Sequence, residues 1–488
     1  MPAWAHGKTG GQSMRLSKRG FLAGSSALGV AGIGVGTGAA STLGILPSQA
    51  FAQSAQPPLT SDIGKLEKVL VHSVSRVEPI STQISRELIP YADYDPIAAE
   101  QQHAALNSLL RASGADVIEV VDALGAARDA TLASGIWEAW IDAYFPRLGA
   151  NPNDVTAKRI MGQDEEWNYR LNDAGNYDHR VDRFTSTMWT RDSAFMTPKG
   201  LVICNSKSPR RGRENMLLRF LYRYSPMLAD VPIAVDAVEE GFIVEGGDAM
   251  VVDEKTLFLG VGNRTSPDAG AILARRLDMD VYTVQIGTPE FLREEYGGAQ
   301  TPLSALALLF LHLDTSFTLV GPKHALALPY IFEQAHSEDG PLARYIRGAV
   351  RQSLLGLDDA EKGLTLLKGI GTLTRYAAGT GEAEPIEEMK LVDYCRNQGY
   401  RITNTGGAIP DGDDAAFRHF MSVTYPEQRR QASNVVQALP GRVIAYEGNP
   451  ATTAALEADG VMVDTFPGRE LWNWHGGPHC LTQPLVRS

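Results

Sequence analysis

The stretch "GGPHCLTQPL" (residues 476–485) lies close to the end of the 488-residue sequence and decides how the rest of the chain is interpreted. It places Cys480 among glycines and a proline, directly after His479. A structural cysteine usually lies within an apolar strand or helix, as Cys204 does in "LVICN" (residues 201–205). The loop-forming residues and the histidine around Cys480 instead indicate a reactive thiol.

The composition is typical of a globular protein, with 44% apolar and 21% charged residues. A net charge of −12 argues against a nucleic-acid partner, because such a partner needs a basic face. The three cysteines, Cys204, Cys395 and Cys480, are too few for a disulfide framework, and their odd number leaves at least one thiol free. No Cys-x-x-Cys pair or histidine-rich spacing indicates zinc, so we expect no metal.

The first 52 residues have the layout of a secretory signal, with a basic start, a Gly/Ala-rich run and small residues at Ala50 and Ala52. The sequence "SKRGFL" (residues 17–22) resembles the twin-arginine export motif, with Lys18 in place of the first arginine. So many Gly and Ser residues make a poor membrane-spanning helix. We therefore expect a signal peptide at 1–52, a linker at 53–60 and an exported, periplasmic or extracellular protein without a membrane anchor after cleavage.

Strand and helix patterns alternate through residues 61–488. A strand in "KLEKVLVHSV" (65–74) precedes apolar residues at helical spacing and a second strand in "DVIEVV" (116–121). Further strands are expected within 194–206, 241–262, 280–287, 305–321 and 441–448. The stretches 122–180 and 330–395 favour helical insertions, the second without any strand pattern. The sequence thus predicts an α/β fold with short hairpins and two helical excursions.

Two polar side chains interrupt the apolar run "LHLDTSFTLV" (residues 311–320). On a strand, His312 and Asp314 would point to the same face. Both need partners if they are buried. The pair could bind a metal, act as a catalytic acid and base, or form a polar pair at the end of the strand.

Two further carboxylates lie at the borders of apolar runs. Glu245 precedes Gly246 and Gly247 in "VEGGDAMVV", where a glycine turn would let the carboxylate line a pocket or leave it in solvent. Asp192 follows Arg191 in "MWTRDSAFM", where the two could form a local ion pair. Neither motif alone indicates a reaction.

Together and in this order, the motifs resemble those of the arginine deiminases, members of the guanidino-modifying pentein superfamily, over residues 61–488. The matching pieces are "TRD" (190–192), "RENMLLRFLYRYSP" (213–226), "VEGGD" (244–248), "NRTS" (263–266), "HLDT" (312–315), "GRVIAYEGNPATTAALEADGV" (441–461) and "GGPHCLTQPL" (476–485). The resemblance implies a five-bladed propeller of ββαβ units around one pocket, with a helical insertion before "TRD".

The resemblance also implies a role for each polar residue. Cys480 would attack the guanidinium carbon of the substrate, and Asp192 and Asp314 would hold the guanidinium group. Glu245 would lie near the departing nitrogen, and His312 would protonate that nitrogen and then activate water. The expected substrate is a small guanidino compound, L-arginine first, and no cofactor is required.

The sequence departs from the family pattern where arginine deiminases recognise the amino-acid end of the substrate. His475 replaces an arginine, Ser186 replaces an asparagine, and Trp189 replaces a phenylalanine. The candidates that remain for binding a substrate carboxylate are Arg211, Arg213, Arg264 and His475 itself. A deiminase of another guanidino compound, an amidinotransferase and a non-catalytic binding protein of the same fold remain alternatives. A homo-oligomer is also compatible with the sequence.

Overall fold

The computed structural model describes residues 61–73, 95–145, 151–164, 167, 169–171, 177–179, 187–208, 211–262, 264–287, 306, 308–336, 338–473 and 475–488. The expected signal peptide and linker lie outside these residues, as does Ser186. Every described residue belongs to one compact unit, which spans residues 53–488. No helix in these ranges combines the length and the apolar character needed to cross a bilayer.

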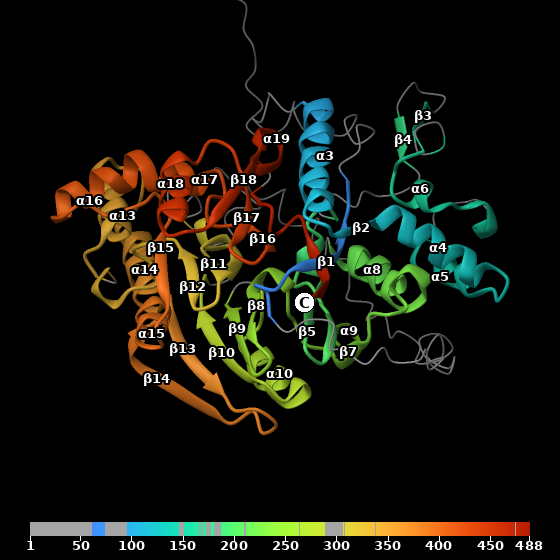
Figure 1. The fold of residues 1–488 in the computed structure, drawn as a ribbon, viewed down its shortest axis with the longest axis horizontal. Helices are drawn as coiled ribbons and strands as arrows, with labels where there is room; N and C mark the ends of the chain where they lie inside the picture. Colours follow the sequence, from blue (N-terminus) through green and yellow to red (C-terminus); the bar gives the residue numbers. More distant parts are fainter. Residues whose placement is uncertain are drawn as a thin grey trace, which may run out of the picture. The chain divides into compact units, whose positions relative to one another are not determined.

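One supersecondary unit recurs along the chain: an antiparallel hairpin, a connection, and a third strand that pairs in parallel with the second strand of the hairpin (Figure 1). Such a parallel return requires a crossover, which a helix usually supplies. The first three examples, in strand order, are β5 (Ala194–Thr197), β6 (Gly200–Ile203) and β7 (Ile233–Asp236); β8 (Ala249–Asp253), β9 (Thr256–Val261) and β10 (Asp280–Gln285); and β11 (Phe317–Gly321), β12 (His324–Ala327) and β15 (Arg401–Asn404).

The fourth example consists of β16 (Val436–Leu439), β17 (Arg442–Tyr446) and β18 (Met462–Phe466). The fifth unites distant segments of the sequence: β19 (Gln483–Arg487) pairs antiparallel with β1 (Leu66–Val71), and β2 (Asp116–Glu119) pairs in parallel with β1. The expected strand–helix–strand start of the domain is confirmed as β1, α3 (Pro96–Ala112) and β2.

Helices fill the connections of these units. The connecting and flanking helices are α8 (Gly212–Tyr224), α9 (Ala237–Glu240), α10 (Ala269–Leu277), α16 (Asp413–His419), α17 (Tyr425–Arg429), α18 (Pro450–Ala458) and α19 (Arg469–Trp472). The α10 helix shows the reason most simply, because its buried residues Ala269, Gly270, Leu273, Ala274 and Leu277 recur at helical spacing and form one apolar face.

The stretch 122–180 is largely helical, as predicted, but it also holds a short hairpin. Its elements are α4 (Val120–Leu132), α5 (Ile136–Tyr144), α6 (Ala157–Ile160), β3 (Tyr169–Leu171) and β4 (Tyr177–His179). Aromatic residues join it to α8, since the ring of Trp140 stacks on Phe220 with centroids 4.4 Å apart and Trp137 packs edge-on against Phe220. The insertion is therefore part of the main core.

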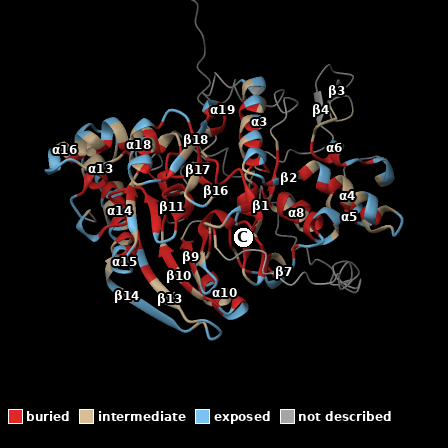
Figure 2. Ribbon diagram, in the orientation of Figure 1, coloured by how far each residue is buried: buried red, intermediate tan, exposed pale blue. Residues whose placement is uncertain are grey.

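The prediction that 330–395 lacks strands is wrong. The helices α13 (Pro341–Arg351), α14 (Leu357–Gly369) and α15 (Leu391–Asn397) are present, but β13 (Thr372–Tyr376) and β14 (Ala383–Lys390) form a hairpin between them. This hairpin extends the sheet of β8, β9 and β10, because β13 pairs with β10. Figure 2 shows most of β14 exposed at the outer edge of the sheet. Its sequence "AEPIEEMK" therefore lacks the apolar alternation of a half-buried strand.

The expectation of a strand through residues 311–320 is partly wrong. Residues Leu313–Thr315 form a 3-10 turn (η7), and β11 begins only at Phe317. Local polar contacts stabilise this turn: the backbone N–H of Leu313 donates to Asp248 Oδ1 at 3.0 Å, and Thr315 Oγ1 donates to the carbonyl of His312 at 2.7 Å. Side chains that hydrogen-bond to nearby backbone compete with strand pairing. His312 and Asp314 therefore do not share a strand face.

Candidate functional site

The candidate site is built from the segments that precede the first strand of each unit. Two further 3-10 turns resemble η7 in this position: Thr190–Ser193 (η2) comes before β5, and Gly246–Asp248 (η5) comes before β8. Cys480 lies in the turn before β19. The arrangement gathers polar side chains from separate sheets at one place, and each is anchored by the strand that follows it.

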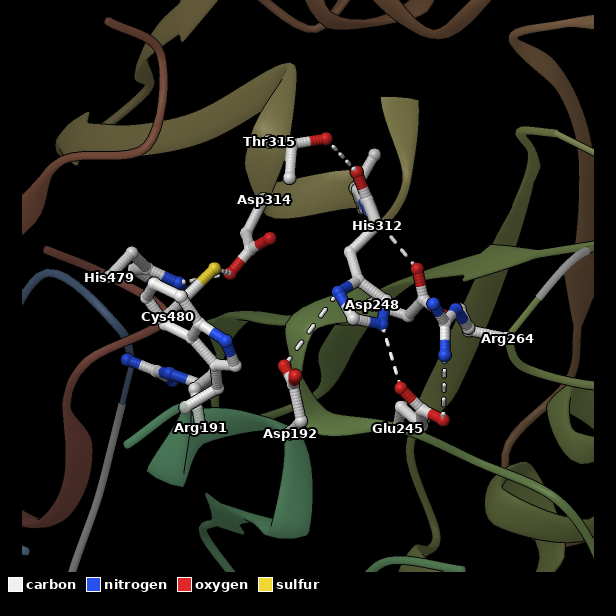
Figure 3. Close-up of polar contacts among 12 residues, drawn as sticks. Arg191, Asp192, Glu245, Asp248, Arg264, His312, Asp314, Thr315, His479 and Cys480 are labelled. Carbon is white, nitrogen blue, oxygen red and sulfur yellow. Dashed lines mark hydrogen bonds and ion pairs between the residues drawn. The ribbon is translucent and has the colours of Figure 1, made fainter. Parts of the chain in front are cut away.

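The turns bring the five predicted catalytic residues together (Figure 3). Cys480 Sγ lies 3.4 Å from Asp314 Oδ2. His312 Nε2 lies 2.9 Å from Glu245 Oε2, and His312 Nδ1 lies 3.7 Å from Asp192 Oδ1. All five side chains are buried, and none of the five is more than 5% exposed.

Cys480 sits in an environment that disfavours its thiolate. Burial raises the pKa of the thiol, and the nearby carboxylates of Asp314 and Asp192 raise it further, well above its ordinary value. The backbone N–H of Gly477 acts in the opposite direction. At neutral pH Cys480 is therefore a thiol, and its S–H donates toward Asp314 Oδ2.

His312 has the opposite balance. Burial alone would lower its pKa, but the carboxylates of Asp192, Asp248 and Glu245 outweigh burial and raise the pKa of His312 to about 10. The imidazole is therefore protonated at neutral pH and holds a proton for a leaving group. Burial alone would raise the pKa of Glu245, but the hydrogen bond with His312 and the charges of Arg264 and Arg211 outweigh burial and lower this pKa.

The three carboxylates each leave one oxygen without a hydrogen bond. Glu245 Oε2 contacts His312, Asp192 Oδ2 accepts from Arg211 at 2.7 Å, and Asp314 Oδ2 lies 2.9 Å from His479 Nδ1. The second oxygen of each side chain is buried and has no hydrogen-bond partner within the described chain: Asp192 Oδ1, Glu245 Oε1 and Asp314 Oδ1. Buried acceptors without donors are costly, so the site is arranged for a ligand that brings several N–H donors.

The three arginines expected to bind a substrate carboxylate, Arg211, Arg213 and Arg264, have different surroundings. Arg211 donates to Asp192 and to Glu214 at 3.0 Å, so its guanidinium is held inside the site. Arg264 Nη1 lies 4.0 Å from Glu245 Oε1. Arg213 lies in the first turn of α8, and its side chain is outside the described part.

His475 does not offer a positive charge at neutral pH. Burial and the nearby charge of Arg429 lower its pKa to about 4. Trp189 lies against the same loop, because a Cβ on Gly476 would come within 2.3 Å of its ring. The histidine that replaces the expected arginine is therefore neutral, and the tryptophan holds the loop in place.

The prediction of site residues from the sequence missed three buried residues. His479 contacts Asp314, and Asp248 accepts from Thr265 Oγ1 at 2.6 Å and from the backbone of Leu313. Asn434 precedes β16 and donates to Cys480 Sγ at 3.2 Å. Asp248 and His479 lie within the motifs "VEGGD" and "GGPHCLTQPL", so their positions in these motifs could have indicated them. Asn434 lies in "RQASNVV" (430–436), which contains no such motif.

By distance alone, three of these residues could hold a metal ion. Ligand atoms of Asp192, Glu245 and His312 lie within 4.8 Å of one another. The chemistry of this set does not suit a metal ion, however, because protonated His312 has no lone pair with which to coordinate one. A planar organic cation fits the free oxygens better than a metal ion does.

Comparisons with known proteins point to one family. The family model for arginine deiminase matches residues 155–293 and 421–487. Arginine deiminase of Borrelia duttonii (strain Ly) is 26% identical over 462 residues, which cover 88% of this chain and 97% of the relative. Arginine deiminase of Clostridium perfringens (strain SM101 / Type A) is 25% identical over 460 residues, which cover 88% and 98%.

Two solved structures illustrate the structural similarities found. Unliganded AgrE matches with a TM-score of 0.43 and 12% identity, over 87% of this chain and 40% of that protein. The adduct of dimethylarginine dimethylaminohydrolase with 4-chloro-2-hydroxymethylpyridine matches with a TM-score of 0.41 and 14% identity, over 86% and 99%.

Proposed function

We propose that this chain is a member of the arginine deiminase family and that it hydrolyses L-arginine to L-citrulline and ammonia through a covalent intermediate on Cys480. The family match and the similarity to curated arginine deiminases over 88% of the chain support this assignment. One structural observation carries it: three buried carboxylate oxygens without hydrogen bonds lie around a cysteine and a protonated histidine.

The substrate guanidinium supplies what these oxygens lack. It is planar, carries one positive charge and has five N–H donors in a fixed fork. Carboxylates bind such a fork strongly because the hydrogen bonds are assisted by charge. We assign Asp192 and Asp314 to the guanidinium. We assign Glu245, which contacts His312, to the side of the departing nitrogen.

Binding of this cation also activates the nucleophile. Burial and the carboxylates of Asp314 and Asp192 raise the pKa of Cys480, so a positive charge between these carboxylates offsets their part of the shift and favours the thiolate. The thiol proton leaves to solvent, and the thiolate forms a bond to the guanidinium carbon. His312 gives its proton to the departing nitrogen, and the C–N bond to this nitrogen breaks. Ammonia is released, and the rest of the substrate stays bonded to Cys480 Sγ through its amidino carbon.

Hydrolysis of the intermediate reverses the role of His312. The neutral imidazole takes a proton from water, and the hydroxide formed attacks the same carbon. Cleavage of the C–S bond returns the thiolate and gives the ureido group of citrulline. The remaining hydroxyl proton is released to solvent, where it converts the released ammonia to ammonium.

We infer that Arg264 binds the α-carboxylate of the substrate. Its Nη1 lies 4.0 Å from Glu245 Oε1, whereas the Arg211 guanidinium donates to Asp192 and to Glu214. His475 is neutral above its lowered pKa and cannot replace the charge of an arginine.

We also propose that the five repeated units form the blades of a propeller around this site. Contacts between consecutive units support it: α10 contacts β7, β8 contacts β11, β11 contacts β16, β16 contacts β1, and β19 contacts β5. The site residues come from the segments that precede the first strands, as expected if these segments converge on a common axis.

The reaction is tested by incubating purified protein with L-arginine, agmatine and a peptidyl arginine and by measuring ammonia and the ureido product. Cys480→Ser should abolish turnover, and mass spectrometry with a slow substrate should find the adduct on Cys480. The matched control is Cys395→Ser, a buried core cysteine on α15, which should retain activity. Much higher kcat/KM for agmatine or a peptidyl arginine would overturn the choice of substrate, and transfer to an added amine without ammonia would indicate an amidinotransferase.

A further inference from the structure

We propose that Asn434 is a catalytic residue that stabilises the thiolate of Cys480 with its side-chain amide. This inference rests on the proposed function, because it takes Cys480 as the nucleophile. Asn434 precedes β16, the first strand of the fourth unit, as η2, η5, η7 and the Cys480 turn precede the first strands of the other four. The fourth unit thus contributes to the site from the same position as the others.

The amide of Asn434 makes three hydrogen bonds at the nucleophile. Its Nδ2 donates to Cys480 Sγ at 3.2 Å and to the carbonyl of Asp314 at 2.9 Å. Its Oδ1 accepts from the backbone N–H of Cys480 at 3.1 Å. The side chain is completely buried, so no solvent competes for these bonds.

These contacts fix which end of the amide faces the sulfur. The carbonyl of Asp314 can only accept, so it requires the NH₂ group, and the backbone N–H of Cys480 can only donate, so it requires the oxygen. A reversed amide would break both bonds. The NH₂ group therefore stays directed at Sγ in either protonation state of the cysteine.

The amide gains importance when the thiol loses its proton. The S–H group contacts Asp314 Oδ2, and that contact becomes repulsive once the sulfur is negative. The bond from Asn434 instead becomes stronger, because hydrogen bonds to ionised acceptors are about twice as strong as neutral ones. Asn434 and the backbone N–H of Gly477 then remain as donors to the sulfur.

The other titratable and charged groups near Cys480 do not supply this effect. Asp314 of η7 and Asp192 of η2 disfavour the thiolate, and Tyr446 of β17 is a neutral phenol whose pKa is raised by burial and by Cys480. His479 is held neutral by burial and by Arg191, and its Nδ1 faces Asp314. Arg191 meets Cys480 through its backbone N–H, which donates to the cysteine carbonyl.

The loop of Cys480 is also shaped around Asn434. A Cβ on Gly477 would come within 2.5 Å of the Asn434 side chain, so only glycine lets the two segments approach this closely. The backbone N–H of His479 reaches the carbonyl of Asn434 at 3.4 Å. A structural role for Asn434 is therefore present as well, and the test has to separate the two.

Gln428 of α17 provides the matched control. It is an equally buried amide that donates to the carbonyls of Leu309 and Thr315 and accepts from Ser433, so it holds the same η7 turn. None of its described hydrogen bonds reaches Cys480. Gln428→Ala should disturb the turn without removing a donor from the sulfur.

The experiment measures the pH dependence of Cys480 alkylation by iodoacetamide in the absence of substrate, with the labelled site identified by mass spectrometry. Asn434→Ala should raise the midpoint of this profile by about one to two pH units and lower kcat by about 10- to 100-fold, with a smaller change in KM. Gln428→Ala should keep the midpoint of the wild-type protein even where it lowers the thermal stability.

If Asn434→Ala does not fold, Asn434→Ser serves as the second variant, since it removes the same donor with a smaller loss of volume. An unchanged midpoint in a folded Asn434 variant would overturn the inference, as would an equal shift in Gln428→Ala. Failure of the proposed function appears separately, as turnover that survives in Cys480→Ser, because the alkylation profile does not depend on turnover.

Discussion

At the scale of single residues, Cys480 and His312 are both protonated at neutral pH, the first as a neutral thiol and the second as a cation. The thiol of Cys480 keeps its proton because burial and the carboxylates of Asp314 and Asp192 disfavour the thiolate. His312 keeps its proton because the carboxylates of Asp192, Asp248 and Glu245 outweigh burial and favour the imidazolium. A substrate cation next to Asp192 changes both pKa values together, since this carboxylate contributes to both shifts. Reactivity is therefore tied to the presence of a guanidinium group.

This argument predicts opposite effects of Asp314→Asn on labelling and on turnover. Removal of the carboxylate next to Sγ lowers the thiol pKa, so iodoacetamide should label Cys480 about tenfold faster or more at neutral pH. Turnover should fall, because the guanidinium loses a ligand. Labelling rates by mass spectrometry and ammonia release check the two effects, and slower labelling would contradict the electrostatic account.

His312 should make the stability depend on pH in a defined direction. Its pKa is about 10 in the folded protein, against about 6.5 in an unfolded chain. A raised pKa contributes stability fully below about pH 6.5, and this contribution is lost as the pH rises through about 10. His312→Asn should therefore cost about 3–5 kcal/mol at pH 6 and less at pH 10. Urea unfolding of the wild-type protein and the variant at pH 6 and pH 10 measures this cost. An equal loss of unfolding free energy at the two pH values would contradict the prediction.

Arg264 should distinguish substrates that carry a carboxylate. Arg264→Gln removes the proposed partner of the α-carboxylate, so KM for L-arginine should rise about 10- to 100-fold while kcat changes less. Agmatine lacks the carboxylate, and its KM or inhibition constant should stay within a few-fold of the wild-type value. Steady-state kinetics with both compounds decide, and an equal loss for both would assign Arg264 to the guanidinium end.

At the scale of elements, the turns determine the geometry of the site more than the strands do. The turn Gly246–Asp248 packs against both η2 and η7, and Gly247 lies where these turns meet. A Cβ at Gly247 would come within 2.7 Å of His312 Nδ1 and 2.9 Å of Asp192 Oδ1. The absence of a side chain at this residue therefore permits His312 and Asp192 to approach each other.

Gly247→Ala should therefore lower kcat more than it lowers stability. The added methyl group has to displace His312 and Asp192, and a misplacement of about 1 Å can cost about 100-fold in rate. The matched control is Gly212→Ala at the first residue of α8, where a Cβ would meet nothing within 4 Å. Kinetics and thermal unfolding of both variants provide the comparison. Equal activity of the two variants would show that the turn tolerates a side chain.

The elements also show where prediction from the sequence succeeds. Strands with a buried face, such as β9 and β17, are evident from their apolar residues. The edge strand β14 is not, because its residues are mostly exposed, and η7 is not, because its shape comes from Asp248, 65 positions earlier in the chain. Cys480 is evident from its surroundings, whereas Asn434 becomes visible only through contacts with segments 46 and 120 positions away.

At the scale of the whole molecule, the sequence of the first 52 residues differs in character from the rest of the chain, with a basic start and a Gly/Ala-rich run. We propose that these residues direct export through the twin-arginine route, as the sequence "SKRGFL" suggests. That route carries folded proteins, which suits an enzyme that depends on a reduced thiol. It also requires that the site be complete before the protein leaves the cytoplasm.

Replacement of Lys18 and Arg19 by Gln should leave a precursor in the cytoplasm, because the motif depends on this basic pair. Fractionation and the mass of the N-terminus measure the outcome. Replacement of Lys8 and Arg15 by Gln, which removes the same charge outside the pair, is the control and should leave export intact. Unchanged export of the Lys18/Arg19 variant would show that the segment is not read as a twin-arginine signal.

The sheet formed by β19, β1 and β2 has a consequence for synthesis on the ribosome. Leu66 of β1 pairs with Arg487 of β19, so β1 cannot form this pairing until almost the entire domain has been translated. Cys480 reaches its place only when β19 closes this sheet, and the other catalytic side chains are already made by then. The proposed site of a nascent chain therefore stays incomplete until Cys480, its proposed nucleophile, has been synthesised.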